Sequence, residues 1–69
     1  MKYICKDVFI INDNLIGRKG DMLEITDAVP MKNESLEDVA GCCDIKNLST
    51  NIMFFATWND VDDTLEIIE

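Results

Sequence analysis

Apolar and polar residues alternate over residues 22–26, where Leu23 and Ile25 are separated by polar side chains. Successive side chains of a strand point to opposite faces, so this alternation predicts a half-buried β-strand. The polar segment 18–21 stands before it, and Gly20 is free to take a positive φ there. We therefore expect a tight turn that leads into a strand.

The segment 41–46 alternates in the same way, although it contains two adjacent cysteines. As a strand it places Cys43 and Ile45 on one face and Cys42 on the other. Adjacent cysteines on opposite faces cannot chelate one ion, and a tetrahedral zinc site needs at least three protein ligands. The chain has no histidine. We expect Cys43 to be a core residue, Cys42 a partly exposed thiol, and no metal site or cofactor.

The N-terminal residues 2–11 are rich in β-branched and aromatic side chains and predict a strand. The apolar residues occupy odd-numbered positions at first, at Tyr3 and Cys5, and even-numbered positions later, at Val8 and Ile10. A bulge inserts one residue and reverses the face that follows, so we expect a bulge near residues 6–7. The strand should end in a turn at residues 12–14, which are Asn and Asp residues.

The only proline lies within residues 27–39, which predict a long surface connection. Residues 35–41 add a short helical turn to this connection. Either Asn33 or Ser35 serves as its N-cap, and Gly41 ends it.

The most apolar segment is residues 52–58, which follows a hairpin loop at residues 47–51. Its apolar residues fall on both faces of the predicted strand. A chain of 69 residues has little material with which to cover two faces. We expect the C-terminal segment to cover one of them, with a partner or a second copy as the alternative.

Residues 60–68 predict a C-terminal helix. Aspartates at its start favour the positive end of the helix dipole, and an apolar stripe follows the i, i+4, i+7 positions of Val61, Leu65 and Ile68. The alternative is an edge strand over residues 64–68, with Leu65 and Ile67 on one face.

Together these elements predict one domain over residues 1–69, mainly β with a minor helical part (α+β). The expected architecture is a small SH3-like barrel, or a strongly bent antiparallel sheet of four to five strands, with a short C-terminal helix.

Acidic residues dominate the charge of the chain: fourteen Asp and Glu against six Lys and Arg give a net charge of −8. No basic residue follows Lys46. Direct binding to nucleic acid or to anionic membranes is disfavoured, because phosphate contacts need clustered Lys and Arg. A protein partner with a basic surface is favoured.

Other function classes find little support in the sequence. No histidine base, phosphate-binding glycine loop or paired nucleophile is present, so we expect no enzyme activity. An EF-hand loop counted from Asp60 lacks the central glycine and the twelfth residue. Three cysteines and no long apolar run favour a reducing, cytoplasmic location.

Two segments, "RKGDMLEIT" and "FFATWNDVDDTLEII", resemble short SH3-like β-barrel proteins of phages and prophages of low-GC bacteria. In those proteins a Lys-Gly-Asp turn leads into a β-strand. The resemblance implies a non-catalytic accessory protein in the cytoplasm of a bacterial host cell. The chain lacks the paired aromatics of the groove that binds proline-rich ligands in SH3 domains.

The leading hypothesis is a small acidic binding protein that inhibits a host nucleic-acid-handling protein by docking on its basic surface. The expected partner-binding residues are four carboxylates and two aromatic anchors, namely Asp60, Asp62, Asp63, Glu66, Phe55 and Trp58. The alternative is a self-assembling β protein, a homo-oligomer in which residues 52–58 pair with their copy and the acidity serves solubility.

Overall fold

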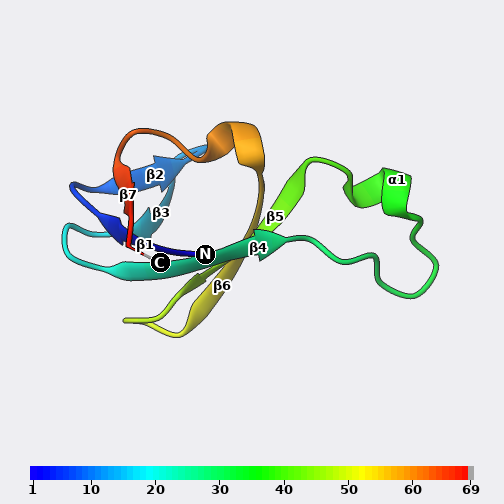
Figure 1. Cartoon of the computed structure of the whole chain (residues 1–69), viewed down its shortest axis with the longest axis horizontal. Coiled ribbons are helices and arrows are strands. Elements are labelled where there is room, and N and C mark those ends of the chain that lie inside the picture. Colours follow the sequence, from blue (N-terminus) through cyan, green and yellow to red (C-terminus); the bar gives the residue numbers. More distant parts are fainter. Residues whose placement is uncertain (69) are drawn as a thin grey trace.

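The computed structural model describes residues 1–68, and strands make up most of its regular structure (Figure 1). The elements in chain order are β1 (Lys2–Cys5), β2 (Phe9–Ile11), β3 (Asn14–Gly17), β4 (Met22–Asp27), α1 (Leu36–Val39), β5 (Cys42–Asn47), β6 (Ile52–Thr57), the 3-10 turn η1 (Trp58–Asp60) and β7 (Leu65–Ile67). The prediction of a mainly β chain is confirmed.

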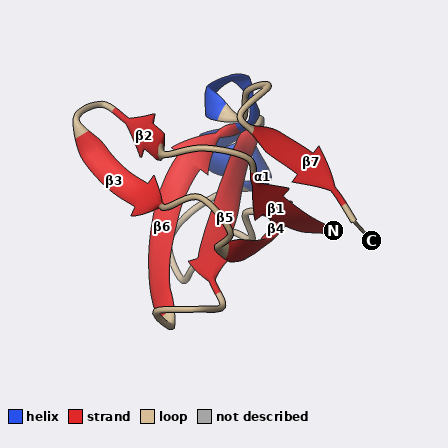
Figure 2. Ribbon diagram, turned by 90° about the vertical axis from the view of Figure 1, so that its left-hand side faces the viewer, coloured by secondary structure: helices blue, strands red, loops and turns tan. Residues whose placement is uncertain are grey.

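Five strands form one antiparallel sheet in the order β6-β5-β4-β1-β7, and β2 and β3 form a separate hairpin (Figure 2). Within residues 1–68 no hydrogen-bonded ladder joins the two sheets, so the barrel of the prediction is not closed. The sheet therefore keeps two edge strands, β6 and β7.

The core lies on one face of the five-stranded sheet, where the predicted alternation holds. Leu23 and Ile25 of β4 are fully buried, as are Cys43 and Ile45 of β5. The β2–β3 hairpin adds buried side chains to the same cluster. The core residues are Tyr3, Cys5, Phe9, Ile11, Ile16, Leu23, Ile25, Cys43, Ile45, Ala56 and Leu65.

The N-terminal segment differs from the prediction. There is no bulge at residues 6–7, because the chain leaves the sheet there and enters the separate hairpin. Phe9 is buried, whereas Val8 is 48% exposed, so the inward phase is that of Tyr3 throughout. The larger aromatic ring fills the core, and the register shift lies instead between Phe9 and Ile10. The expected left-handed turn is present, with positive φ at Asn12.

The predicted C-terminal helix is wrong. Residues 58–60 form a single 3-10 turn, and Leu65–Ile67 form an edge strand beside β1, as the alternative proposed. A nine-residue helix gains little stability by itself, whereas a strand here satisfies the backbone groups of β1 that face away from β4. Leu65 is buried and Ile67, on the same face, is 56% exposed.

The long connection between β4 and β5 is confirmed and carries α1 well away from the sheet (Figure 1). Ser35 is the N-cap of α1, and its backbone N–H donates to Asp38 Oδ2 at 2.7 Å. Gly41 follows with a φ of 78°, a left-handed conformation that glycine adopts without strain.

Candidate partner-binding surface

The structure distributes the predicted partner-binding residues over the whole width of the sheet. Phe55 lies on β6, and Trp58 and Asp60 lie in η1 directly after it. Glu66 lies on β7, the opposite edge strand. Phe55 and Glu66 are therefore not brought together, and the four carboxylates do not form one compact face.

Trp58 has a structural role in this arrangement. Its side chain is half-buried and packs against the core cluster. The indole Nε1–H donates to Asp27 Oδ1 at 2.7 Å, so the one polar group of the ring has a partner. Trp58 thus closes the end of the core between β4 and η1.

Asp60 is held by the turn that it belongs to. Its Oδ2 accepts from the Thr57 backbone N–H at 3.0 Å and from Thr57 Oγ1 at 2.9 Å. The backbone bond and then the hydroxyl bond lower the pKa of the Asp60 carboxyl below its usual value. This carboxylate stabilises the end of β6, in addition to any contact with a partner.

The remaining predicted carboxylates lie beyond η1. Asp62 Oδ1 accepts from the Thr64 backbone N–H at 2.8 Å and shapes the turn that leads into β7. Asp62, Asp63 and Glu66 are all exposed. They are the predicted residues most accessible to a partner.

Two further carboxylates join Asp60 at the end of the sheet from which the α1 connection leaves. Asp27 stands opposite Cys43, and Asp44 stands opposite Phe55. Burial first, and then Asp44, Asp60, Cys42 and Asp27, raise the pKa of the Cys43 thiol to about 11. Strand register brings both residues close to Cys43, with Asp27 on the Cys43 face and Asp44 on the outer face, so their separation in the sequence hid them.

The predicted burial of Cys43 and partial exposure of Cys42 are confirmed. Cys43 is buried and Cys42 half-buried, and the pKa of about 11 keeps the Cys43 thiol protonated even at moderately alkaline pH. Among residues 1–68 no group of three or more Cys, Asp or Glu side chains is placed to hold a metal ion. In the same range no helix is long and apolar enough to cross a membrane.

The outer face of the sheet, opposite the core, mixes charged and apolar side chains. Phe55 is 59% and Met53 61% exposed on this face of β6. Met53 stands opposite Lys46, which in turn stands opposite Glu24. Phe55 is one of the predicted partner-binding residues, whereas Met53, which shares its face two residues earlier, was not predicted as one.

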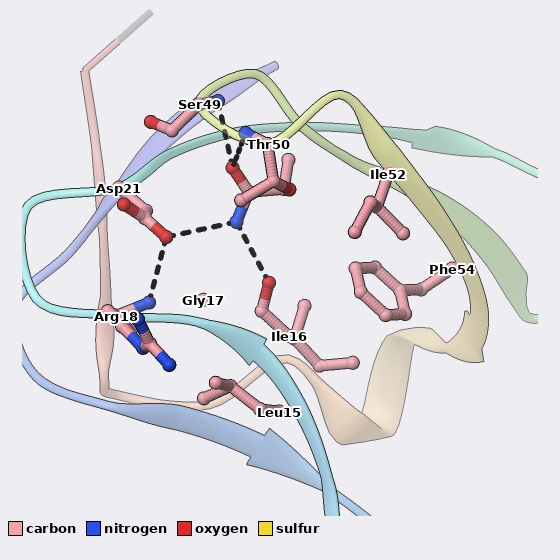
Figure 3. A pocket seen from close by; sticks show the side chains of 10 residues that line it. Leu15, Ile16, Gly17, Arg18, Asp21, Ser49, Thr50, Ile52 and Phe54 are labelled. Carbon is pink, nitrogen blue, oxygen red and sulfur yellow. Dashed lines mark hydrogen bonds between the residues drawn. The ribbon is translucent and has the colours of Figure 1, made fainter.

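A pocket of about 430 Å³ lies between the β2–β3 hairpin and β6 on the core side (Figure 3). Apolar side chains of β3 and β6 line one part of it, and polar groups of the β3–β4 turn and the β5–β6 loop line the other. The lining residues are Leu15, Ile16, Gly17, Arg18, Asp21, Asn47, Ser49, Thr50, Ile52 and Phe54.

Asn47 connects the polar side of this pocket to three parts of the chain. Its Nδ2 donates to Ile16 O at 3.0 Å and to Asp21 Oδ2 at 3.1 Å. Its Oδ1 accepts from the backbone N–H groups of Ser49 at 2.8 Å and Thr50 at 3.1 Å (Figure 3). Asn47 is 1% exposed, so these bonds replace the water that its amide loses on folding.

Comparison of the chain with protein-family models, with curated proteins and with solved structures gave no match in any of the three.

Proposed function

We propose that this chain is a small, non-catalytic, acidic binding protein that docks on a basic surface of a protein partner. The proposal rests on Asp62 and Asp63 together with the acidic end of the sheet that precedes them, formed by Asp27, Asp44 and Asp60. Together they present carboxylates on a chain of net charge −8, and Asp62 and Asp63 are exposed. Complementary charge speeds the encounter and selects the partner.

An apolar contribution supports the carboxylates. Phe55 is exposed directly beside Asp44 across the β5–β6 ladder. An aromatic side chain at the centre of an interface often provides much of the binding energy, and surrounding charges provide selectivity. Trp58 contributes indirectly, because it holds Asp27 in place through its indole N–H.

The biological part of the proposal rests on the resemblance to small phage proteins. The partner is a nucleic-acid-handling protein of a bacterial host, and the chain acts in the cytoplasm of that cell as an inhibitor. Carboxylates that occupy a channel built for phosphates block it without any active site. The SH3-like architecture belongs to the same proposal, in an open form in which the hairpin and the sheet share one core.

Charge reversal tests the docking. Asp62→Lys with Asp63→Lys changes the net charge by four, and so does the control pair Asp7→Lys with Glu37→Lys, whose side chains are also exposed. The protein and both variants are used to capture partners from bacterial lysate at low and raised salt. A nucleic-acid-handling protein that is retained by the native chain is then purified, and its affinity and activity are measured.

We expect the first pair to weaken binding at least about tenfold and to reduce its salt dependence, because close charge pairs are lost. The control pair should weaken it less, through net charge alone. Equal effects of the two pairs would refute docking through this surface. Binding that leaves the activity of the partner unchanged would refute the inhibitor role.

A further inference from the structure

The backbone hydrogen-bonding pattern shows which groups of β6 face outward. Trp58 N–H donates to Gly41 O at 2.9 Å, just beyond the β5–β6 ladder. Bonds to one neighbour come from alternate residues of an antiparallel strand. Ile52, Phe54 and Ala56 therefore bond to β5. The residues between them direct their N–H and C=O groups to the open edge.

A second bond agrees with this assignment. Ala28 N–H donates to Cys42 O at 3.1 Å, so Cys42 and the even-numbered residues of β5 bond to β4. Cys43, Ile45 and the other odd-numbered residues then bond to β6. The outward residues of β6 are accordingly Met53, Phe55 and Thr57.

Thr57 is already protected. Its N–H donates to Asp60 Oδ2 at 3.0 Å, so Asp60 closes that end of the edge. Met53 and Phe55 are left with two N–H and two C=O groups that face outward. β6 contains no charged residue, no proline and no bulge, the usual devices that prevent an edge strand from pairing.

We propose that a second copy of this chain pairs with β6 antiparallel, about a twofold axis that passes through Phe54. Met53 then stands opposite Phe55 of the second copy, and Phe55 stands opposite Met53 of the second copy. All the outward N–H and C=O groups of these residues are used, in four interchain hydrogen bonds. The result is one continuous antiparallel sheet of ten strands.

The neighbouring registers satisfy fewer groups. A shift by two residues in one direction brings Thr57 opposite Met53, although the Thr57 N–H is bonded to Asp60. The shift in the other direction brings Asn51 opposite Phe55. Asn51 has a φ of 64° and belongs to the loop, so it cannot continue the ladder. The register centred on Phe54 is therefore preferred.

The side chains fit the same register. Met53 and Phe55 of both copies form one apolar cluster on the outer face, with each thioether beside an aromatic ring. Lys46 stands beside Met53, and Asp44 stands beside Phe55. Across the dimer, four side chains therefore lie in a row: Lys46 and Met53 of one copy, followed by Phe55 and Asp44 of the second copy. No like charges meet, although each chain carries a net charge of −8.

The core side of β6 leaves room for this pairing. The pocket separates the β2–β3 hairpin from β6, so Phe54 is only half-buried and Ile52 is 52% exposed. One strand per copy makes a small interface compared with the roughly 1,200–2,000 Å² that stable complexes bury. We expect a reversible dimer with a dissociation constant in the micromolar range.

Self-pairing is independent of docking on a basic partner. It uses the edge of β6, whereas Asp62 and Asp63 lie after η1 and stay exposed. Phe55 and its cross-strand neighbour Asp44 take part in both. Loss of the dimer through a change at β6 and loss of docking through a change at Asp62 and Asp63 can therefore be observed separately.

Sedimentation of the full chain from micromolar to millimolar concentration tests the association. The mass should rise from one chain toward two. Phe55→Glu should raise the dissociation constant at least about tenfold, because it places two carboxylates diagonally across the twofold axis and buries polar atoms in the apolar cluster. Ile67→Glu is the matched control on β7, with 56% exposure against 59%, and should change it less than about twofold.

Disulfide formation tests the register, in a Cys42→Ser background that removes the half-buried native thiol. Phe54→Cys places two thiols directly opposite each other on the axis, where Cα atoms are about 4.5 Å apart and a disulfide can form. Phe55→Cys leaves them diagonal, about 7–8 Å apart. Thermal unfolding checks that both variants fold. A monomer at millimolar concentration, or crosslinking at 55 and not at 54, would overturn the proposal.

Discussion

The two edges of the sheet differ in length, charge and hydrogen bonding. β6 has six residues without charge, and its outward groups at Met53 and Phe55 have no partner among residues 1–68. β7 has three residues and carries Glu66. The Leu65 N–H on β7 is bonded to Asp62 O at 3.2 Å, so Ile67 alone directs an N–H outward. β7 is thus protected against pairing, whereas β6 is protected only at its Thr57 end.

The two edges of the sheet therefore differ in their capacity to pair with another strand. A short, acidic edge strand closes the sheet without attracting another chain. A longer, apolar edge strand keeps a surface that only another β-strand satisfies fully.

The largest effect is expected at the base of β6, where Asn47 supports the β5–β6 loop. Asn47→Ala removes four hydrogen bonds, leaves the Ile16 carbonyl without the Asn47 donor, and leaves Asp21 Oδ2 with the bond from the Arg18 backbone N–H. We expect a loss of about 3 kcal/mol in the free energy of unfolding, measured by urea denaturation. Asn59→Ala, at an exposed position, is the control. A loss equal to that of the control would contradict the role given to Asn47.

The edge at β7 depends on one buried side chain. Leu65→Ala removes the only core residue of β7, and large-to-small changes of this kind cost about 2–5 kcal/mol. We expect a value near 2 kcal/mol by urea denaturation, because the site lies at the periphery of the core. Ile67→Ala should cost less than about 0.5 kcal/mol, since that side chain is exposed. Equal costs would show that Leu65 does not anchor the edge.

Alkaline pH tests the burial of Cys43, which lies opposite Ala56 of β6. The folded pKa of about 11 exceeds the ordinary 9.0, so the folded state holds the thiol proton more tightly than the unfolded state. The stabilisation that the folded state gains from the protonated Cys43 thiol is complete below pH 9 and is lost as the pH rises toward about 11. Denaturation midpoints should fall in that window, and Cys43→Ala should reduce the fall. An equal fall in that variant would contradict the assignment.

The smallest effect concerns the closed end of β6. Asp60→Asn removes a carboxylate whose pKa is lowered by its bonds to Thr57. The stabilisation from the ionised Asp60 carboxylate is complete above the pKa that Asp60 has in the unfolded chain. It is lost as the pH falls through the lower pKa of the folded chain. We expect a slight loss of stability at neutral pH that disappears in acid, as the pH falls through the lowered pKa of Asp60, measured by thermal unfolding. A difference that persists in acid would argue against the charge of Asp60 as its source.

Local pattern was sufficient for part of the fold. The alternation in β4 and β5 correctly placed Leu23 and Cys43 inside, because each strand has one buried face. The C-terminal residues fit both a helix stripe and a strand alternation. The choice between them depends on the open edge of β1, which is far away in the sequence. No local signal contains that information.

The candidate site was predictable to a smaller extent. Phe55 stood out because its segment is apolar on both faces, and it is exposed. Asp27 and Asp44 join Asp60 only through strand register, which the sequence does not specify. The role of Asn47 had a weak signal, since an asparagine that precedes Ser and Thr residues often accepts their backbone N–H groups.

Hydrogen exchange of individual amides, measured by NMR over a range of protein concentration, compares the two edges most directly. The open-edge account predicts that Met53 and Phe55 amides exchange more slowly as concentration rises. The Thr57 amide, bonded to Asp60, and the Ile67 amide on β7 should keep their rates. Concentration-independent exchange at Met53 and Phe55, or slowing at Ile67 instead, would contradict it.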